Sequence, residues 1–157
     1  MRTKDYADVA IKPPILFLGA LLLGCLLTVW VPIGSGIAEP NGLGLAVGLS
    51  FVVLGFGLAI FPARRFQRAG TSVMPGEAST VLIRDGLYRV TRNPIYIGLI
   101  LLYFGLSIVL TSVWMLLLLS PAVVVLHRGV VKREEDYLDW KFGDDYRRYV
   151  RQVPRWL

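Results

Sequence analysis

The segment from Arg84 to Gly98, RDGLYRVTRNPIYIG, carries a dense set of hydrogen-bonding side chains and lies between strongly apolar segments. Its arginines, asparagine and tyrosines provide donors and aromatic faces. Further along the chain, Glu134 and Glu135 provide adjacent carboxylates, which accept hydrogen bonds or protons. If the fold brings the two sets together, they form a site for a ligand that carries both positive and negative charge.

Both sets also have ordinary structural interpretations. Asp85-Gly86 is typical of a turn, and Asn93-Pro94 is typical of a helix start, with asparagine as N-cap and proline at the first helical position. Consecutive helical residues point about 100° apart, so at most one of Glu134 and Glu135 can face water squarely. An inward carboxylate needs a cationic partner. The candidates from spacing are basic residues nearby: Arg128, Lys132 and the arginines of the preceding loop.

The apolar blocks around these residues predict an all-α integral membrane protein. Hydrophobic residues make up 55% of the 157 residues and gather in the uncharged blocks 15–31, 43–61 and 95–126. As one helix the third block would extend about 48 Å, beyond a hydrocarbon core of roughly 30 Å, so we divide it at Thr111-Ser112. The prediction is a single membrane domain, with spans 14–31, 43–61, 94–110 and 112–128, a cytoplasmic loop 62–93 and a cytoplasmic tail 129–157.

The basic residues orient these spans. With four spans, all 17 lysines and arginines lie on one side, whereas the loop on the other side, about 32–42, holds only Glu39 as a charged residue. Cytoplasmic loops are enriched in Lys and Arg, so both termini are expected in the cytoplasm. The net charge of +6 then reflects topology and anionic lipid headgroups rather than nucleic acid. The first apolar block is longer than the core of a cleaved signal peptide.

The tail is predicted to be helical and interfacial. It alternates charges with an apolar stripe at helical spacing, formed by Leu138, Phe142, Tyr146, Tyr149 and Val153. We expect a helix that leaves the fourth span, breaks near Gly143 and lies on the inner leaflet, with Trp140 and Trp156 at headgroup level.

Small residues and a proline mark the spans themselves. Glycines in the second span would let a neighbouring helix approach closely: Gly44, Gly48, Gly55 and Gly57. Pro121 removes a backbone hydrogen bond inside the fourth span.

The single cysteine, Cys25, can form neither a disulfide within the chain nor a thiolate metal site. No metal is expected.

The two polar segments, GLYRVTRNPIYIG and EEDYLDWKFGDDYRRYVRQVPRWL, together resemble the membrane methyltransferase superfamily of isoprenylcysteine carboxyl methyltransferases and phospholipid N-methyltransferases. In that superfamily an Arg-His-Pro-x-Tyr-x-Gly segment and paired glutamates bind S-adenosylmethionine at the cytoplasmic membrane face. The segment is matched by Arg92, Pro94, Tyr96 and Gly98, with Asn93 in place of the histidine. Asparagine at this position, and a Gly-x-Gly like Gly55-Phe56-Gly57, are similar to the phospholipid enzymes.

The resemblance implies an S-adenosylmethionine-dependent methyltransferase that releases S-adenosylhomocysteine. Phosphatidylethanolamine is the expected acceptor, and an isoprenylcysteine-type carboxylate or another small hydrophobic acceptor is the alternative. The implied cofactor-binding residues are Tyr88, Arg92, Asn93, Pro94, Tyr96, Gly98, Glu134 and Glu135. The tail beyond Gly143 is expected to act as a lid.

An amine acceptor must lose a proton before it attacks, which requires a general base. The candidates are Glu135, Tyr96 and His127, in that order. Two other classes stay open, a small tetraspan packing protein without chemistry and a transporter, for which the spans offer few polar groups. The sequence leaves open the oligomeric state and the number of methylation steps.

Overall fold

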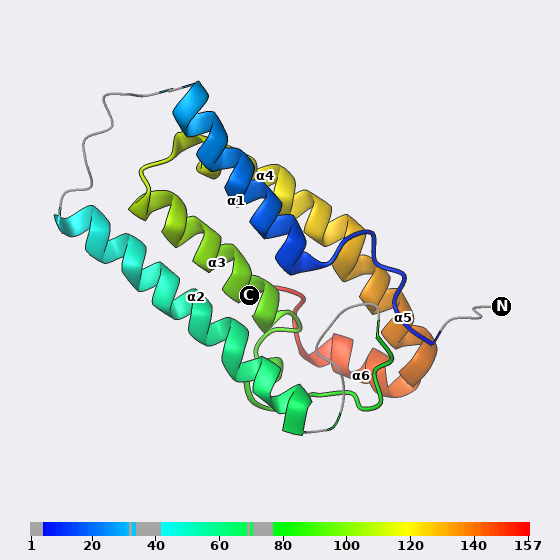
Figure 1. The fold of residues 1–157 in the computed structure, drawn as a ribbon. Helices are drawn as coiled ribbons and strands as arrows, with labels where there is room; N and C mark the ends of the chain where they lie inside the picture. Colours follow the sequence, from blue (N-terminus) through cyan, green and yellow to red (C-terminus); the bar gives the residue numbers. More distant parts are fainter. Residues whose placement is uncertain (1–4, 32, 34–41, 69, 71–76) are drawn as a thin grey trace.

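The computed structural model describes residues 5–31, 33, 42–68, 70 and 77–157, and these residues are all helical or irregular. The chain forms α1 (Pro13–Trp30), α2 (Gly42–Arg68), the short 3₁₀ turn η1 (Gly86–Arg89), α3 (Pro94–Val109), α4 (Val113–Leu126), the π-helical turn η2 (His127–Val131), α5 (Lys132–Phe142) and α6 (Asp144–Gln152). The four long helices lie side by side, and α5 and α6 gather at one end (Figure 1). The predicted all-α class is confirmed.

Three helical stretches are long and apolar enough to cross a membrane: Pro13–Trp30, Gly42–Phe66 and Val113–Phe142. The fourth apolar helix, α3, is shorter, with 16 residues. At about 1.5 Å per residue it extends about 24 Å. The second helix continues past the predicted limit at Phe61 as far as Arg68, with Pro62 inside it. Most of the predicted outer loop, 32–42, lies outside the described residues.

Glycines hold α2 and α3 in backbone contact. A Cβ added at Gly55 would lie 2.6 Å from the carbonyl oxygen of Gly98, and one at Gly105 would lie 2.6 Å from that of Gly48. The glycines in each helix are seven residues apart, so the backbones approach closely at two points two helical turns apart. The predicted close approach is confirmed at Gly48 and Gly55, whereas a Cβ at Gly57 would meet only Phe61 of its own helix, at 3.6 Å.

The turn between α3 and α4 follows the predicted division of the third apolar block. Thr111 has a positive φ of 48°, and the Ser112 side chain accepts a hydrogen bond from Met115 N, which caps the start of α4. The same hydroxyl lies 2.6 Å from Thr28 Oγ1 of α1. A side-chain cap is expected where a helix begins in an apolar environment, because its first amide groups lack internal partners.

The helix that begins with α4 continues without a break through η2 into α5. It therefore connects the apolar part of the molecule directly to Glu134 and Glu135. At Gly143 the backbone has φ 51°, a conformation that favours glycine, and the chain turns into α6. The predicted break near Gly143 is confirmed.

The apolar stripe of the tail is used inside the protein. Tyr146, Tyr149 and Val153 are buried together with Tyr88 of η1, and Leu138 and Phe142 contact the same cluster. The stripe thus holds α6 against the segment before α3, which corrects the expectation that this face rests on a leaflet. Trp156 packs beside His127, with ring centroids 6.1 Å apart, whereas Trp140 is about half exposed.

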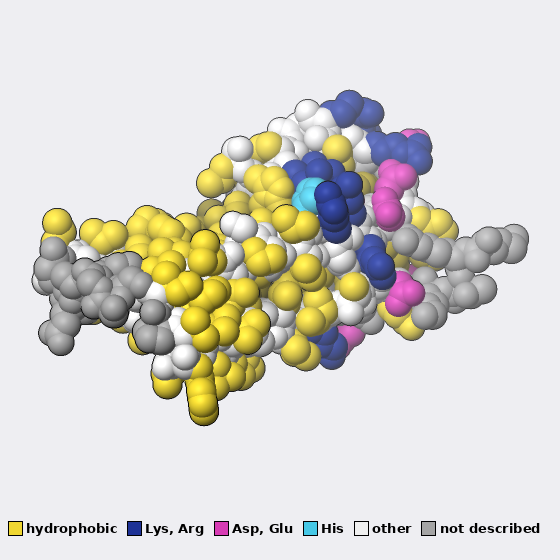
Figure 2. All heavy atoms as spheres, turned by 90° about the horizontal axis from the view of Figure 1, so that it is seen from above, with side chains coloured by type: hydrophobic (Ala, Val, Ile, Leu, Met, Phe, Trp, Pro, Cys, Tyr) yellow, Lys and Arg dark blue, Asp and Glu magenta, His cyan; other side chains and the backbone are white. Residues whose placement is uncertain are grey.

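Charged side chains gather at the end of the molecule that holds α5 and α6, and apolar side chains predominate over the rest of the described surface in Figure 2. The exposed apolar residues come mainly from α1, α2 and α4. At the charged end, Asp5 accepts a hydrogen bond from Lys141, and Ala10 N donates to Gly129 O. The segment before α1 therefore lies along η2 and α5.

Candidate functional site

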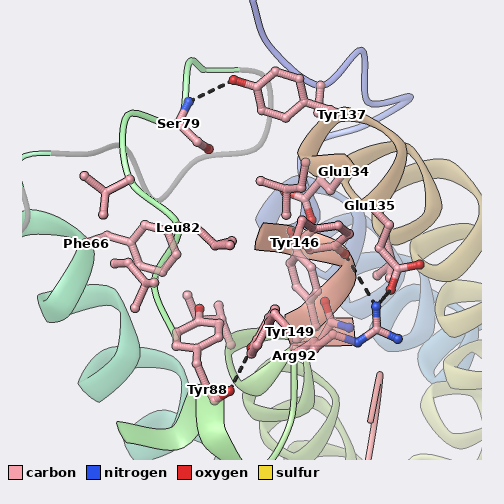
Figure 3. A pocket seen from close by; sticks show the side chains of 18 of the residues that line it. Phe66, Ser79, Leu82, Tyr88, Arg92, Glu134, Glu135, Tyr137, Tyr146 and Tyr149 are labelled. Carbon is pink, nitrogen blue, oxygen red and sulfur yellow. Dashed lines mark hydrogen bonds and ion pairs between the residues drawn. The ribbon is translucent and has the colours of Figure 1, made fainter. Parts of the chain in front are cut away.

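A pocket opens at the charged end, where the start of α3 faces α5 and α6 (Figure 3). The 77–83 segment, η1 and the end of α2 complete its wall. Among the described residues, the lining combines aromatic rings, three acids and one basic side chain. Its aromatic residues are Phe66, Tyr88, Tyr96, Tyr137, Tyr146 and Tyr149, and its charged residues are Glu77, Arg92, Glu134 and Glu135. The two polar segments singled out in the sequence therefore meet in one place.

Glu134 is paired with a phenol. Tyr96 Oη donates a hydrogen bond of 2.7 Å to Glu134 Oε2. Burial, together with the nearby charge of Glu135, raises the pKa of Glu134 to about 7, while the hydrogen bond from Tyr96 opposes the rise. Near neutral pH this carboxyl group therefore exchanges readily between its protonated and ionised forms.

Glu135 is held by two guanidinium groups. Arg155 donates from Nε to Oε1 at 2.9 Å and from Nη2 to Oε2 at 2.6 Å, and Arg92 Nη1 lies 2.9 Å from Oε1. A parallel pair of bonds from one arginine is the strongest geometry for a carboxylate. Both oxygens of Glu135 are thus engaged. These adjacent residues of one helix turn are both directed into the protein, which agrees with the expectation that at most one of them faces water.

Arg92 is the one basic residue among the described residues that line the pocket. Its side chain is 11% exposed. Besides Glu135, its Nη1 contacts Tyr146 Oη at 3.4 Å, but its buried Nε has no hydrogen-bond partner within the described part of the chain. A buried donor without a partner is costly, so an unpaired guanidinium nitrogen beside a pocket marks where an anionic group can bind.

Tyrosines from three elements form the aromatic wall. Tyr149 Oη donates to the carbonyl oxygen of Tyr88 at 2.7 Å, which joins α6 to η1. Tyr137 Oη accepts a hydrogen bond from Ser79 N at 3.1 Å and thereby joins α5 to the 77–83 segment. Burial raises the pKa of Tyr146 to about 12 and that of Tyr88 above its usual range. These phenols stay neutral at physiological pH.

The predicted site residues separate into two groups. Tyr88, Arg92, Asn93, Tyr96, Glu134 and Glu135 line the pocket. Pro94, Gly98 and His127 are not among its lining residues. Pro94 is buried at the first turn of α3, Gly98 lies in the α2–α3 contact, and the His127 ring lies beside Trp156.

Asn93 does not cap α3 with its side chain. It lies at the N-cap position, but its Nδ2 donates to the carbonyl oxygen of Arg155 at 2.9 Å. This corrects the local interpretation of the Asn-Pro pair, because a partner 62 residues away takes the amide. Pro94 occupies the first turn of the helix as predicted.

Sequence reasoning missed Arg155 and the tyrosines Tyr137, Tyr146 and Tyr149 as parts of the site. The spacing of Tyr146 and Tyr149 placed them in an apolar stripe, which is where they lie, but did not indicate what the stripe covers. Arg155 is one of several arginines in the tail and has no distinguishing local pattern.

The fold and the pocket define a class of protein: an all-helical chain with helices apolar enough to cross a membrane and an acidic, aromatic pocket at the charged end of the bundle. Residues 43–145, which include most of the pocket, match the sequence profile of the phospholipid methyltransferase family. The chain belongs to this family.

Two curated proteins are similar over shorter stretches. An uncharacterised protein of Haemophilus influenzae is 51% identical over 35 residues, which are 22% of this chain and 56% of that protein. The protein-S-isoprenylcysteine O-methyltransferase of Schizosaccharomyces pombe is 32% identical over 74 residues, 47% of this chain and 31% of that protein. The chain thus spans about half of one relative and a third of the other. No solved structure matches the chain.

Proposed function

We propose that this protein is an S-adenosylmethionine-dependent methyltransferase that methylates the amine of a membrane phospholipid, phosphatidylethanolamine in particular, at the cytoplasmic face. Family membership supports methyl transfer. The observation that carries the proposal is the lining of the pocket, whose described residues include three acids, six aromatic rings and one arginine. An acidic, aromatic pocket attracts cations.

The residues present fit the methyl donor. S-adenosylmethionine carries a sulfonium, an ammonium and a carboxylate, and when bound it supplies the methyl group. Arg92, with its buried and unpaired Nε, would hold the carboxylate. Glu134 and the tyrosine faces would hold the cationic groups. Tyr88 and Asn93, also in the lining, provide further contacts.

Glu134 is the general base of this proposal, with Tyr96 beside it. Glu135, the first candidate from the sequence, is engaged by two arginines, and His127 lies away from the pocket lining. Glu134 has a pKa of about 7, close to the pH at which a base works best. An ammonium group would pass its proton to Glu134 Oε2, directly or through Tyr96 Oη.

The same lining favours an amine over a carboxylate acceptor. A carboxylate would approach Glu134 and Glu77 with like charge and would compete for Arg92, the one arginine among the described lining residues. An ammonium meets acids and aromatic faces. The alternative acceptor is an isoprenylcysteine-type carboxylate, and the similarity to the Schizosaccharomyces pombe protein supports it.

The proposed topology has four spans with both termini in the cytoplasm, and α3, with 16 residues, is shorter than the three helical stretches Pro13–Trp30, Gly42–Phe66 and Val113–Phe142. The exposed apolar residues of α1, α2 and α4 would face lipid, and the charged end with the pocket would lie at the inner membrane surface. The lipid would reach the pocket laterally, and α6, which contributes Tyr146 and Tyr149, would act as its cover.

The test begins with calorimetric binding of S-adenosylhomocysteine to the wild-type protein in detergent, beside Glu134→Ala, Glu135→Ala and Asn93→Ala. Arg151→Ala, at an exposed position of α6, is the matched control. We expect micromolar binding that the first three variants weaken and the control keeps. Transfer of a labelled methyl group to phosphatidylethanolamine, but not to farnesylcysteine, then identifies the amine acceptor. Absence of binding by folded protein supplied with lipid would favour a packing protein without chemistry.

A further inference from the structure

The segment 153–156 is docked against the residues that precede α3. The carbonyl oxygen of Pro154 accepts a hydrogen bond from Arg92 N at 3.0 Å, and that of Arg155 accepts from Asn93 Nδ2 at 2.9 Å and Thr91 Oγ1 at 3.2 Å. Three bonds from three consecutive residues fix the backbone at Arg155. The side chain of Arg155 therefore extends to Glu135 from a backbone that is held in place.

The guanidinium of Arg155 makes more contacts with the Glu135 carboxylate than that of Arg92 does. Arg155 contacts both carboxylate oxygens, whereas Arg92 contacts only one, through Nη1. The Nε of Arg92 has no partner in the described part of the chain. Two guanidinium groups share one carboxylate, so this cluster has an excess positive charge, located on the arginine that lines the pocket.

We propose that Arg155 is a positioning residue: it occupies Glu135 and so prevents Arg92 from pairing with that carboxylate through two parallel bonds, which keeps Arg92 Nε available to an anionic group of the ligand. The inference rests on the proposed function, because that function supplies the ligand to which Arg92 would bind. The anionic group is either the carboxylate of the methyl donor or the phosphate of the lipid acceptor.

The consequence of losing Arg155 follows from arginine geometry. Nε and one Nη of a guanidinium match the two oxygens of a carboxylate. Without Arg155, Glu135 Oε2 loses its donor, and the nearest remaining guanidinium is that of Arg92, already bound to Oε1. A ligand anion must then displace Glu135 to reach Nε.

The experiment compares ligand pairs that differ by one anionic group, using calorimetry on the full chain in detergent. One pair is S-adenosylhomocysteine and its decarboxylated analogue, and the other is phosphoethanolamine and ethanolamine. In one of the two pairs, we expect Arg155→Ala to bind the member with the anionic group roughly tenfold more weakly than the wild-type protein does. The member without that group should keep its wild-type affinity within about threefold. The pair affected identifies the carboxylate or the phosphate as the group that Arg92 binds.

Controls separate this role from a structural one. Arg151→Ala keeps the wild-type affinities, and Arg155→Lys, which retains the charge but not the two parallel bonds, loses affinity in the same direction to a smaller extent. If Arg155→Ala proves unfolded in thermal melts, Arg155→Lys carries the comparison. Equal losses within both pairs, or no loss, would overturn the inference. Failure of the wild-type protein to bind S-adenosylhomocysteine would instead overturn the proposed function.

Discussion

Replacing Glu134 with glutamine should change how the stability of the protein depends on pH. Glutamine keeps the shape of the side chain and a carbonyl oxygen for the hydrogen bond from Tyr96, but it cannot ionise. In the wild-type protein, burial raises the pKa of Glu134 from its ordinary 4.5 to about 7. The folded state therefore holds this proton over a pH range in which the unfolded state has lost it.

The sign and size of the effect follow from linkage. Below pH 4.5 the carboxyl is neutral in both states and has no pH-dependent cost. Between that value and about 7 the unfolded state ionises first, so the wild-type protein loses stability as the pH rises. Above 7 the loss levels off at about 3 kcal/mol. Glutamine removes this loss, and every other titrating group is shared by the two proteins.

The assay is unfolding of ligand-free protein in detergent at pH 4.5 and pH 8, with the difference in unfolding free energy between Glu134→Gln and wild type as the observable. We expect that difference to grow in favour of the variant by about 3 kcal/mol from the lower to the higher pH. Glu135→Gln is the matched control. It removes the carboxylate from two arginines and should destabilise the protein at both pH values. A difference for Glu134→Gln that stays constant with pH would refute the reasoning.

Three further changes have expected outcomes. Tyr96→Phe removes the hydrogen bond to the base, so turnover should fall about 100-fold while calorimetric affinity for S-adenosylhomocysteine stays within about threefold; an unchanged turnover contradicts the role given to the phenol. Gly98→Ala, whose methyl group would lie 2.6 Å from backbone atoms of α2, should lower the unfolding free energy by about 1–3 kcal/mol, whereas Gly57→Ala should not. Tyr149→Phe leaves the carbonyl oxygen of Tyr88 without its donor and should cost about 1–3 kcal/mol in the same unfolding assay.

Local and periodic features of the structure could be predicted from sequence. The helices follow from long apolar blocks, and the turn at Thr111-Ser112 follows from the limit on helix length. The contact of Gly48 and Gly55 with α3 follows from the need for small residues between closely packed helices. Consecutive antiparallel spans bring the start of α3 and the end of α4 to the same end of the bundle, which is where Tyr96 meets Glu134.

Partners chosen by tertiary structure could not be predicted. The Asn93 amide bonds to Arg155 rather than to its own helix, and nothing within a few residues of either side chain indicates the pairing. The charges in the sequence could not show which arginines would form ion pairs with Glu135. The helical spacing of its apolar residues predicted the aromatic stripe of α6. That spacing does not reveal whether the stripe contacts lipid or, as in this structure, Tyr88.

The wide turn at His127–Val131 takes up one extra residue in the helix that carries the acid pair. A π-helical turn accommodates one residue more than an α-turn, and each helical residue rotates the chain by about 100°. Deleting a single residue there would close the turn to an ordinary one and leave the direction of Glu134 and Glu135 nearly unchanged, whereas deleting one residue from α4 would rotate them away from Tyr96 and Arg92. A gain or loss of a whole turn in α4 would preserve their direction. Outside the wide turn the length of this helix is therefore constrained by angular phase, so that insertions and deletions are tolerated in steps of three or four residues rather than one.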